Sequence, residues 1–146
     1  MTTFAPVAAA EVTACIARHA AGRGEDAGLD EQKVHNLLFL CQGYSLAAHG
    51  APLFAETMWA APGGVSCPAA TTAQKGADSE DVPDEVREVV AHVWGTFGGL
   101  TPQELQARVG RHVTCVQEMS GGGPDLSKSP DAIKMAFTLA IKQGMI

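Results

Sequence analysis

The sequence predicts a mainly α-helical fold: a single compact domain of about five helices with an irregular or short-strand segment after the second helix. Apolar residues recur at three- and four-residue intervals in five stretches. Glycine and proline gather between these stretches. The chain has 146 residues, of which 46% are hydrophobic and 18% charged, which is enough to bury one core. We therefore treat residues 1–146 as one domain.

The first two helices are expected over about residues 8–20 and 30–48. Asp30 fits the N-cap position of the second helix. This helix has apolar residues on more than one side, which predicts a central position in the fold. Gly50 is expected just beyond its end in the left-handed conformation, and Pro52 prevents the helix from continuing.

The next segment, residues 53–72, differs in kind. It has no sustained period, and it contains two prolines and a Gly-Gly pair. Such a composition predicts irregular chain, with a short strand over about residues 54–59. The polar sequence "AQKGADSED" of residues 73–81 is expected to be a loop.

Three further helices follow. The first covers 83–97, where valines repeat at helical spacing. In "LTPQEL", Thr101 and Glu104 have the spacing of a capping box, which predicts a helix from there to about His112. The last helix is expected to begin at Ser129 and Pro130 and to end before Gly144.

The formal net charge is −6, and the ten Lys and Arg residues are scattered. A grip on nucleic acid needs clustered positive charge, so the charge argues against DNA or RNA and favours a basic protein partner. No apolar run reaches the roughly 20 residues that span a bilayer. The start of the chain lacks the basic region of a secretory signal, and we expect a cytoplasmic protein without a membrane partner.

No pattern points to catalysis, a metal or a cofactor. The four cysteines are far apart, which is typical of small core residues, and His112 with Cys115 lacks a second ligand pair. "SGGGP" at 120–124 lacks the lysine of a phosphate-binding loop. The acidic run of residues 78–88 does not match a calcium loop. We expect a protein that is not an enzyme, unless the fold assembles a site from distant residues.

Trp59 stands in the irregular segment and allows two interpretations. Tryptophan buries a large area, so it is often a core anchor. It is also enriched at binding hot spots, so a tryptophan in irregular chain can anchor a partner. The sequence leaves both interpretations open.

The stretch "KVHNLLFLCQGYSLAAHGAPLFAETMWA", residues 33–60, resembles the Panacea domain of SocA-like antitoxins, also called the GepA-like or phage-associated family. That family shows a helix with K-L-L and A-Q-G elements, then a G-x-P-L-F exit, an acidic residue and A-W. The resemblance covers about residues 8–137. The residues that carry the motif, other than Trp59, are Leu37, Leu38, Gln42, Gly43, Tyr44, Leu46, Gly50, Pro52, Leu53 and Phe54, with Ala47 also in register.

The resemblance implies a mostly helical antitoxin that binds and neutralises a cognate toxin encoded beside it, without catalytic residues of its own. Some family members present the toxin to a protease, and this mechanism stays open here. The toxin-binding surface is expected in the segment from Met58 to Pro68, with Trp59 as its anchor. Its expected contact residues are Met58, Trp59, Gly63, Gly64, Val65 and Pro68.

The chain also departs from the family pattern. After Trp59 the family continues G-P-V-x-P with a closing tyrosine, whereas this chain has "MWAAPGGVSCPAA" and lacks that tyrosine. The alternative function is therefore a mobile-element-associated regulatory or adaptor protein that keeps the fold and binds another partner. The sequence leaves open the identity of the toxin and whether the protein forms a homodimer.

Overall fold

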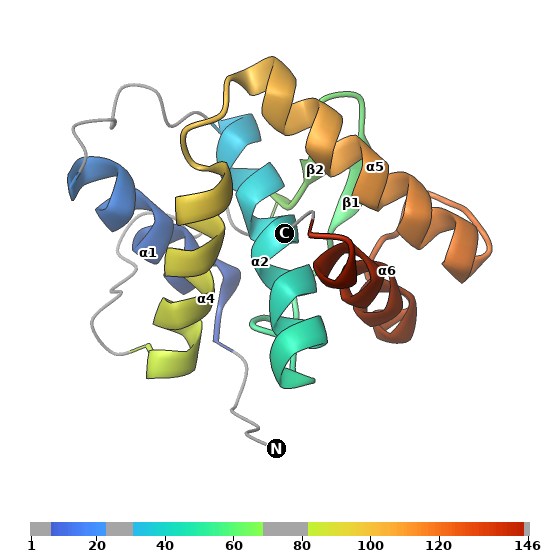
Figure 1. Cartoon of the computed structure of the whole chain (residues 1–146), viewed down its shortest axis with the longest axis horizontal. Coiled ribbons are helices and arrows are strands. Elements are labelled where there is room, and N and C mark those ends of the chain that lie inside the picture. The colour runs from blue at the N-terminus through green and yellow to red at the C-terminus, as the bar shows by residue number, and fades with distance from the viewer. Residues whose placement is uncertain (1–6, 23–30, 69–81, 145–146) are drawn as a thin grey trace.

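The computed structural model describes residues 7–22, 31–68 and 82–144 (Figure 1). These residues form a mainly helical domain with one short antiparallel hairpin after the second helix, as the sequence predicts. The elements are α1 (Ala9–Gly22), α2 (Glu31–His49), β1 (Trp59–Ala61), β2 (Gly64–Ser66), α4 (Asp84–Phe97), α5 (Pro102–Ser120) and α6 (Pro130–Lys142).

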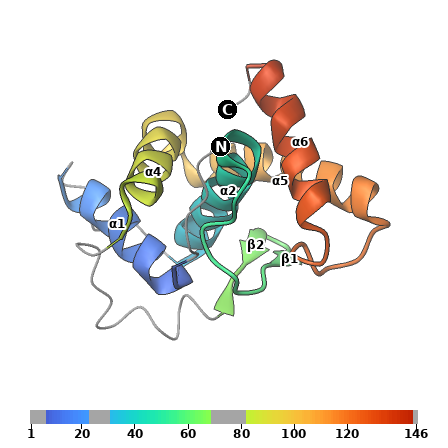
Figure 2. The same cartoon turned by 90° about the horizontal axis from the view of Figure 1, so that it is seen from below.

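Helix α2 is the centre of the domain. It packs against α1, α4, α5, α6 and β2, with α1 and α4 on one side and α5 and α6 on the other (Figure 2). Nearly every residue from Val34 to Leu46 is buried, so the expected central position is confirmed. Gly50 has a φ of 73°, and its amide donates to the Leu46 carbonyl at 3.1 Å, so the helix ends as predicted.

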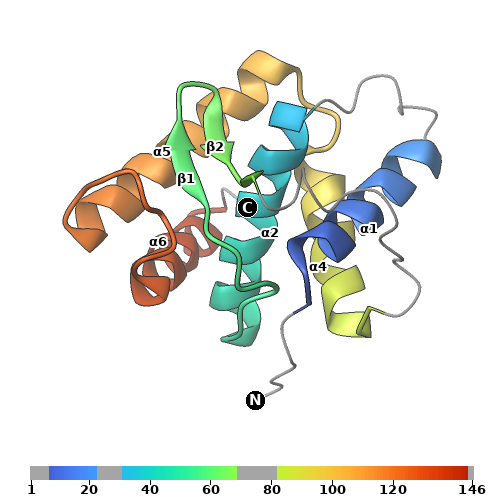
Figure 3. The same ribbon diagram turned by 180° about the vertical axis from the view of Figure 1, so that it is seen from behind.

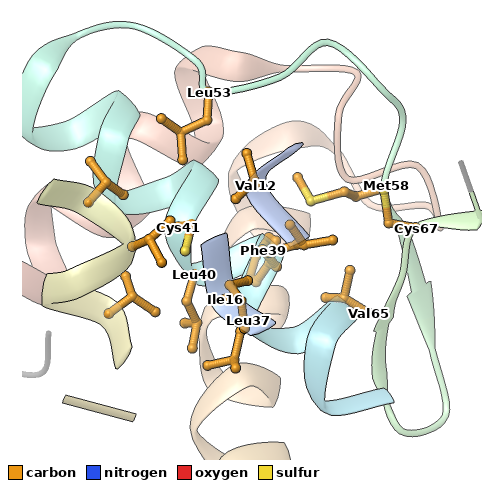
Figure 4. Packing of buried hydrophobic residues seen from close by; sticks show 14 of the residues in the cluster. Val12, Ile16, Leu37, Phe39, Leu40, Cys41, Leu53, Met58, Val65 and Cys67 are labelled. Carbon is orange, nitrogen blue, oxygen red and sulfur yellow. The ribbon is translucent and has the colours of Figure 1, made fainter. Parts of the chain in front are cut away.

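The core is one continuous cluster around α2 (Figure 4). The rings of Phe39 on α2 and Phe137 on α6 meet edge to face, with centroids 5.4 Å apart. Gly43 faces the same ring, and a Cβ at this position would overlap it. Helices α2 and α6 can therefore approach closely only because residue 43 has no side chain.

The helix boundaries agree with the predictions, with one correction. Thr101 and Glu104 form the expected capping box at the start of α5, at 3.2 and 3.0 Å. That helix does not end near His112, however, because Val113 and Val116 continue its buried face. Its end is set by Gly121, which has a φ of 92°.

The segment after α2 is irregular as predicted, but the strand lies elsewhere. Residues 54–58 form no strand, and the hairpin occupies residues 59–61 and 64–66. The expected N-cap at Asp30 and the expected loop at 73–81 lie outside the described residues. Three of the four cysteines are buried and the fourth is half-buried, and none of the four is in a disulfide: Cys15, Cys41, Cys67 and Cys115.

Candidate partner-binding surface

Gln42 fixes the chain where it leaves α2. Its side chain is buried, and its Nε2 donates to the Phe54 carbonyl at 2.8 Å. Its Oε1 accepts from the Leu53 amide at 2.7 Å and from the Phe54 amide at 3.4 Å. One turn further along α2, Ser45 Oγ donates to the Ala51 carbonyl at 2.6 Å. These bonds satisfy backbone groups of a buried segment that has no regular structure of its own.

The first half of α2 holds strand β2 through side chains. Asn36 Oδ1 accepts from the Val65 amide at 2.9 Å, and Asn36 Nδ2 donates to the Gly63 carbonyl at 3.2 Å. Gln32 Nε2 donates to the Val65 carbonyl at 2.8 Å. Gly64 has a φ of 129°, and a Cβ there would overlap the Asn36 amide. The helix side chains thus take the place of a neighbouring strand along this edge.

His35 extends the same contact by one residue. Its Nδ1 accepts from the Cys67 amide at 3.2 Å, which requires an unprotonated Nδ1. Burial lowers the pKa of His35, while Glu31 opposes this shift. His35 is therefore a neutral structural residue.

The other edge of the hairpin is covered by the loop before α6 (Figure 3). The Ala60 amide donates to the Pro124 carbonyl at 2.7 Å, and the Leu126 amide donates to the Met58 carbonyl at 3.0 Å. Ser127 Oγ accepts from the Met58 amide at 2.9 Å. Because both edges are engaged, a partner would meet this hairpin through its side chains rather than by adding a strand.

Trp59 is on the solvent side of this fixed hairpin, and 40% of its surface is exposed. It is paired with Ser66 on β2 and bridged to Asp125 of the loop. The tryptophan that lies in the core is Trp94 on α4, which is 2% exposed. Of the two interpretations, a fully buried core anchor therefore does not describe Trp59.

The other expected contact residues divide into two groups. Met58 and Val65 have no exposed surface, and Gly64 is also buried. Their burial argues against the expectation that they touch a partner. Met58 and Val65 occupy positions that alternate with Trp59 and Ser66 and point inward, whereas Gly64 has no side chain and is covered by Asn36. Gly63 is half-buried and Pro68 is exposed, so both lie near the surface with Trp59.

The residues that carry the resemblance to the Panacea domain form a structural framework around α2. Gln42 and Gly50 shape the exit from α2, and Gly43 admits the Phe137 ring. Tyr44 is half-buried and stacks on His92 of α4, with ring centroids 4.2 Å apart. Pro52 is half-buried, and the remaining motif residues are core side chains: Leu37, Leu38, Leu46, Leu53 and Phe54.

Histidine and cysteine side chains outside this surface lie in packed surroundings that disfavour their charged forms. His112 stacks on Phe137 with ring centroids 4.7 Å apart, and burial, with Arg108 and Arg111 adding to it, lowers the pKa of His112 to about 4. Burial raises the pKa of the Cys41 thiol well above its usual range. Within the described ranges, no group of three or more His, Cys, Asp or Glu side chains could hold a metal ion.

None of the helices in the described part of the chain has the length and apolar character needed to cross a membrane.

The sequence interpretation missed the roles of Gln32, His35 and Asn36. The signal was present, because these polar residues interrupt a helix that is apolar on several sides. A buried polar residue needs a partner, and a neighbouring segment without regular structure needs partners as well.

Searches against family models, curated proteins and solved structures found no match for this chain. The resemblance to the Panacea domain stays a hypothesis that depends on residues 33–60.

Proposed function

We propose that this chain is a non-enzymatic antitoxin, which binds and neutralises a toxin encoded beside it through the surface around Trp59. The observation that carries this proposal is a tryptophan, 40% exposed, on a hairpin that is engaged along both edges. Tryptophan is enriched at binding hot spots. A side chain on a fixed segment also loses little backbone freedom when a partner binds.

Support for a toxin as the partner comes from the motif. Gln42, Gly43 and Gly50 each have a specific task in fixing the exit from α2, which gives a physical reason for the residues that resemble the antitoxin family. The hairpin that follows carries Trp59, the exposed large side chain of the motif. We assign partner recognition to this part of the chain, with Trp59 as its anchor and with Gly63 and Pro68 as the other expected contact residues that are not buried.

The charge supports a protein partner. A net charge of −6 repels nucleic acid and attracts a basic protein surface. The toxin is therefore expected to present positive charge around a pocket that receives the indole of Trp59.

The first experiment is co-expression with the neighbouring reading frames. Each frame is expressed alone and together with this chain, and growth is followed. The proposal expects one frame to arrest growth alone and to be harmless when this chain is present, and the two proteins to co-purify. If no neighbour is toxic, or if the toxic neighbour is not silenced, the proposal is wrong.

The abundance of the toxin in the rescued cells separates two mechanisms. Sequestration leaves the toxin at normal levels in a complex, whereas delivery to a protease lowers its level and makes rescue depend on that protease.

A second candidate is a regulatory or adaptor protein of a mobile element. It is favoured by the missing closing tyrosine after "GGVSCPAA", which alters the segment next to Trp59. This candidate expects a binding partner that depends on Trp59 but no toxic neighbour.

A further inference from the structure

Helix α6 has an apolar strip on its solvent side. Met135 is 59% exposed and Leu139 is 42% exposed, and in the described residues only Trp59 and Met119 are also large, hydrophobic and exposed. Met135 and Leu139 are one helical turn apart on the outer face of α6. This face is opposite the one that buries Phe137. A shallow hollow of about 480 Å³ runs along it, lined by Asp131, Lys134, Met135, Thr138, Leu139 and Lys142.

The apolar surface continues sideways toward α5. Leu139 also lines a second hollow of about 220 Å³ between α5 and α6, together with Cys115, Ala136 and Ala140 and with the polar residues Arg111, His112 and Gln143. Leu139 therefore joins two hollows into one surface, which is wider than the single helix.

The charges on this face are arranged so that the face complements itself. Asp131 lies at the start of α6 and Lys142 at its end, and both line the same hollow. If a second α6 lies against the first in the opposite direction, centred between Ala136 and Phe137, each Asp131 faces the Lys142 of the other copy. In a parallel arrangement the two Asp131 side chains would face each other and so would the two lysines.

We propose that this face of α6 is the interface of an antiparallel homodimer. In that arrangement Met135 lies opposite Thr138 of the second copy, and the aliphatic stem of Lys134 covers Leu139 of the second copy while its ammonium group stays in water. The two helix dipoles run in opposite directions, so the positive end of each helix lies beside the negative end of the other. A two-fold axis uses the same patch twice, as most homodimers do.

The size of the patch sets the expected strength. Thirteen residues give α6 a length of about 20 Å. A strip of that length and about 10 Å wide, one helix diameter, covers roughly 200 Å², which is well below a standard interface of about 800 Å² per partner. The dimer is therefore expected to form in a concentration-dependent way. Sedimentation velocity over about a 100-fold range of protein concentration measures this.

Four variants test the geometry. Met135→Glu is expected to leave only monomer over the whole range. The matched control is Met119→Glu, which changes an exposed methionine on α5 and should leave the dimer unchanged. Asp131→Lys and Lys142→Asp each place like charges opposite one another, so each alone is expected to be monomeric.

The equimolar mixture of Asp131→Lys with Lys142→Asp joins a copy with two lysines to a copy with two aspartates, so a heterodimer should form from two monomeric variants. The decisive sample for the direction of the helices is the double swap Asp131→Lys/Lys142→Asp. It restores opposite-charge pairs only in the antiparallel arrangement, so it should form a homodimer. Circular dichroism checks that each variant is folded, and if Asp131→Lys does not fold, Met135→Glu and Lys142→Asp carry the test. A wild-type protein that is monomeric throughout, a dimer that survives Met135→Glu, or a mixture or double swap that stays monomeric overturns the proposal. None of these results depends on a toxin, so they are separate from the test of antitoxin function.

Discussion

Replacing Gln42 by alanine tests the framework most severely, because one side chain satisfies several backbone groups of the exit segment. The substitution leaves the Leu53 amide and the Phe54 carbonyl without their partners at 2.7 and 2.8 Å. Each buried group left unsatisfied costs about 1–3 kcal/mol, and the vacated volume adds to this. We expect Gln42→Ala to lower the free energy of unfolding by about 3–5 kcal/mol, measured by urea unfolding followed by circular dichroism.

The control is Gln106→Ala on α5, which removes a single bond to the Pro62 carbonyl at an exposed position. It should cost about 0.5 kcal/mol or less. Gln42→Glu adds a sharper check, because a carboxylate can accept from Leu53 but cannot donate to Phe54. Burial raises the pKa of such a glutamate above its unfolded value of about 4.3, so this variant should lose stability relative to the wild type as the pH rises above that value. A loss below about 1 kcal/mol for Gln42→Ala would refute the framework role, since it is less than one buried unsatisfied group costs.

Three further predictions use the same unfolding assay. Gly43→Ala should cost about 2 kcal/mol or more because its Cβ would overlap the Phe137 ring, whereas Gly95→Ala, with open space around it, should stabilise the helix by about 0.5–1 kcal/mol. Gly50→Val should cost about 1 kcal/mol or more, because a β-branched residue does not tolerate a φ of 73°; an unchanged stability would contradict the description of the helix end. Burial, with Arg108 and Arg111, lowers the pKa of His112 to about 4. The neutral ring therefore contributes its full stability above the unfolded-state pKa of about 6.5. This stability is lost as the pH falls toward 4, by up to about 3 kcal/mol. His112→Gln should flatten that part of the pH profile, and an unchanged profile would contradict it.

Local signals in the sequence were sufficient to predict most of the helices. The capping box at Thr101 and the glycine at Gly50 depend on neighbouring residues only, and both predictions are confirmed. The end of α5 was predicted too early, at about His112, and the helix continues past Gly110 to Ser120. The buried face that continues through Val113 and Val116 is a tertiary feature, and packing outweighs the modest cost of one glycine.

The hairpin could not be placed from the sequence for a related reason. Its strands have three residues each, which is too short for an alternating pattern to be recognised. They are held by Asn36 and Gln32 of α2 and by the loop at 124–127, and these contacts join residues that are distant in the chain. For the same reason the sequence could not distinguish the inward side chains of Met58 and Val65 from the outward side chain of Trp59.

The exposed strip on α6 was also beyond the sequence interpretation. The sequence predicts a core face through Ile133, Ala136 and Phe137, and that face is buried. Met135 and Leu139 lie off this stripe, and their exposure follows from the packing of α6 against α2 and α5.

The central claim is that the chain neutralises a toxin through Trp59, and growth rescue by Trp59→Ala tests it most directly. Cells carry the toxic neighbouring frame together with the wild type, Trp59→Ala or Met119→Ala, the last being a control at an exposed residue of similar exposure on α5. We predict that the wild type and Met119→Ala restore growth and that Trp59→Ala does not, since a hot-spot tryptophan contributes about 2 kcal/mol or more to binding. The melting temperature of Trp59→Ala should stay close to that of the wild type because the Trp59 side chain is 40% exposed. A Trp59→Ala protein that is folded and still restores growth would contradict the claim.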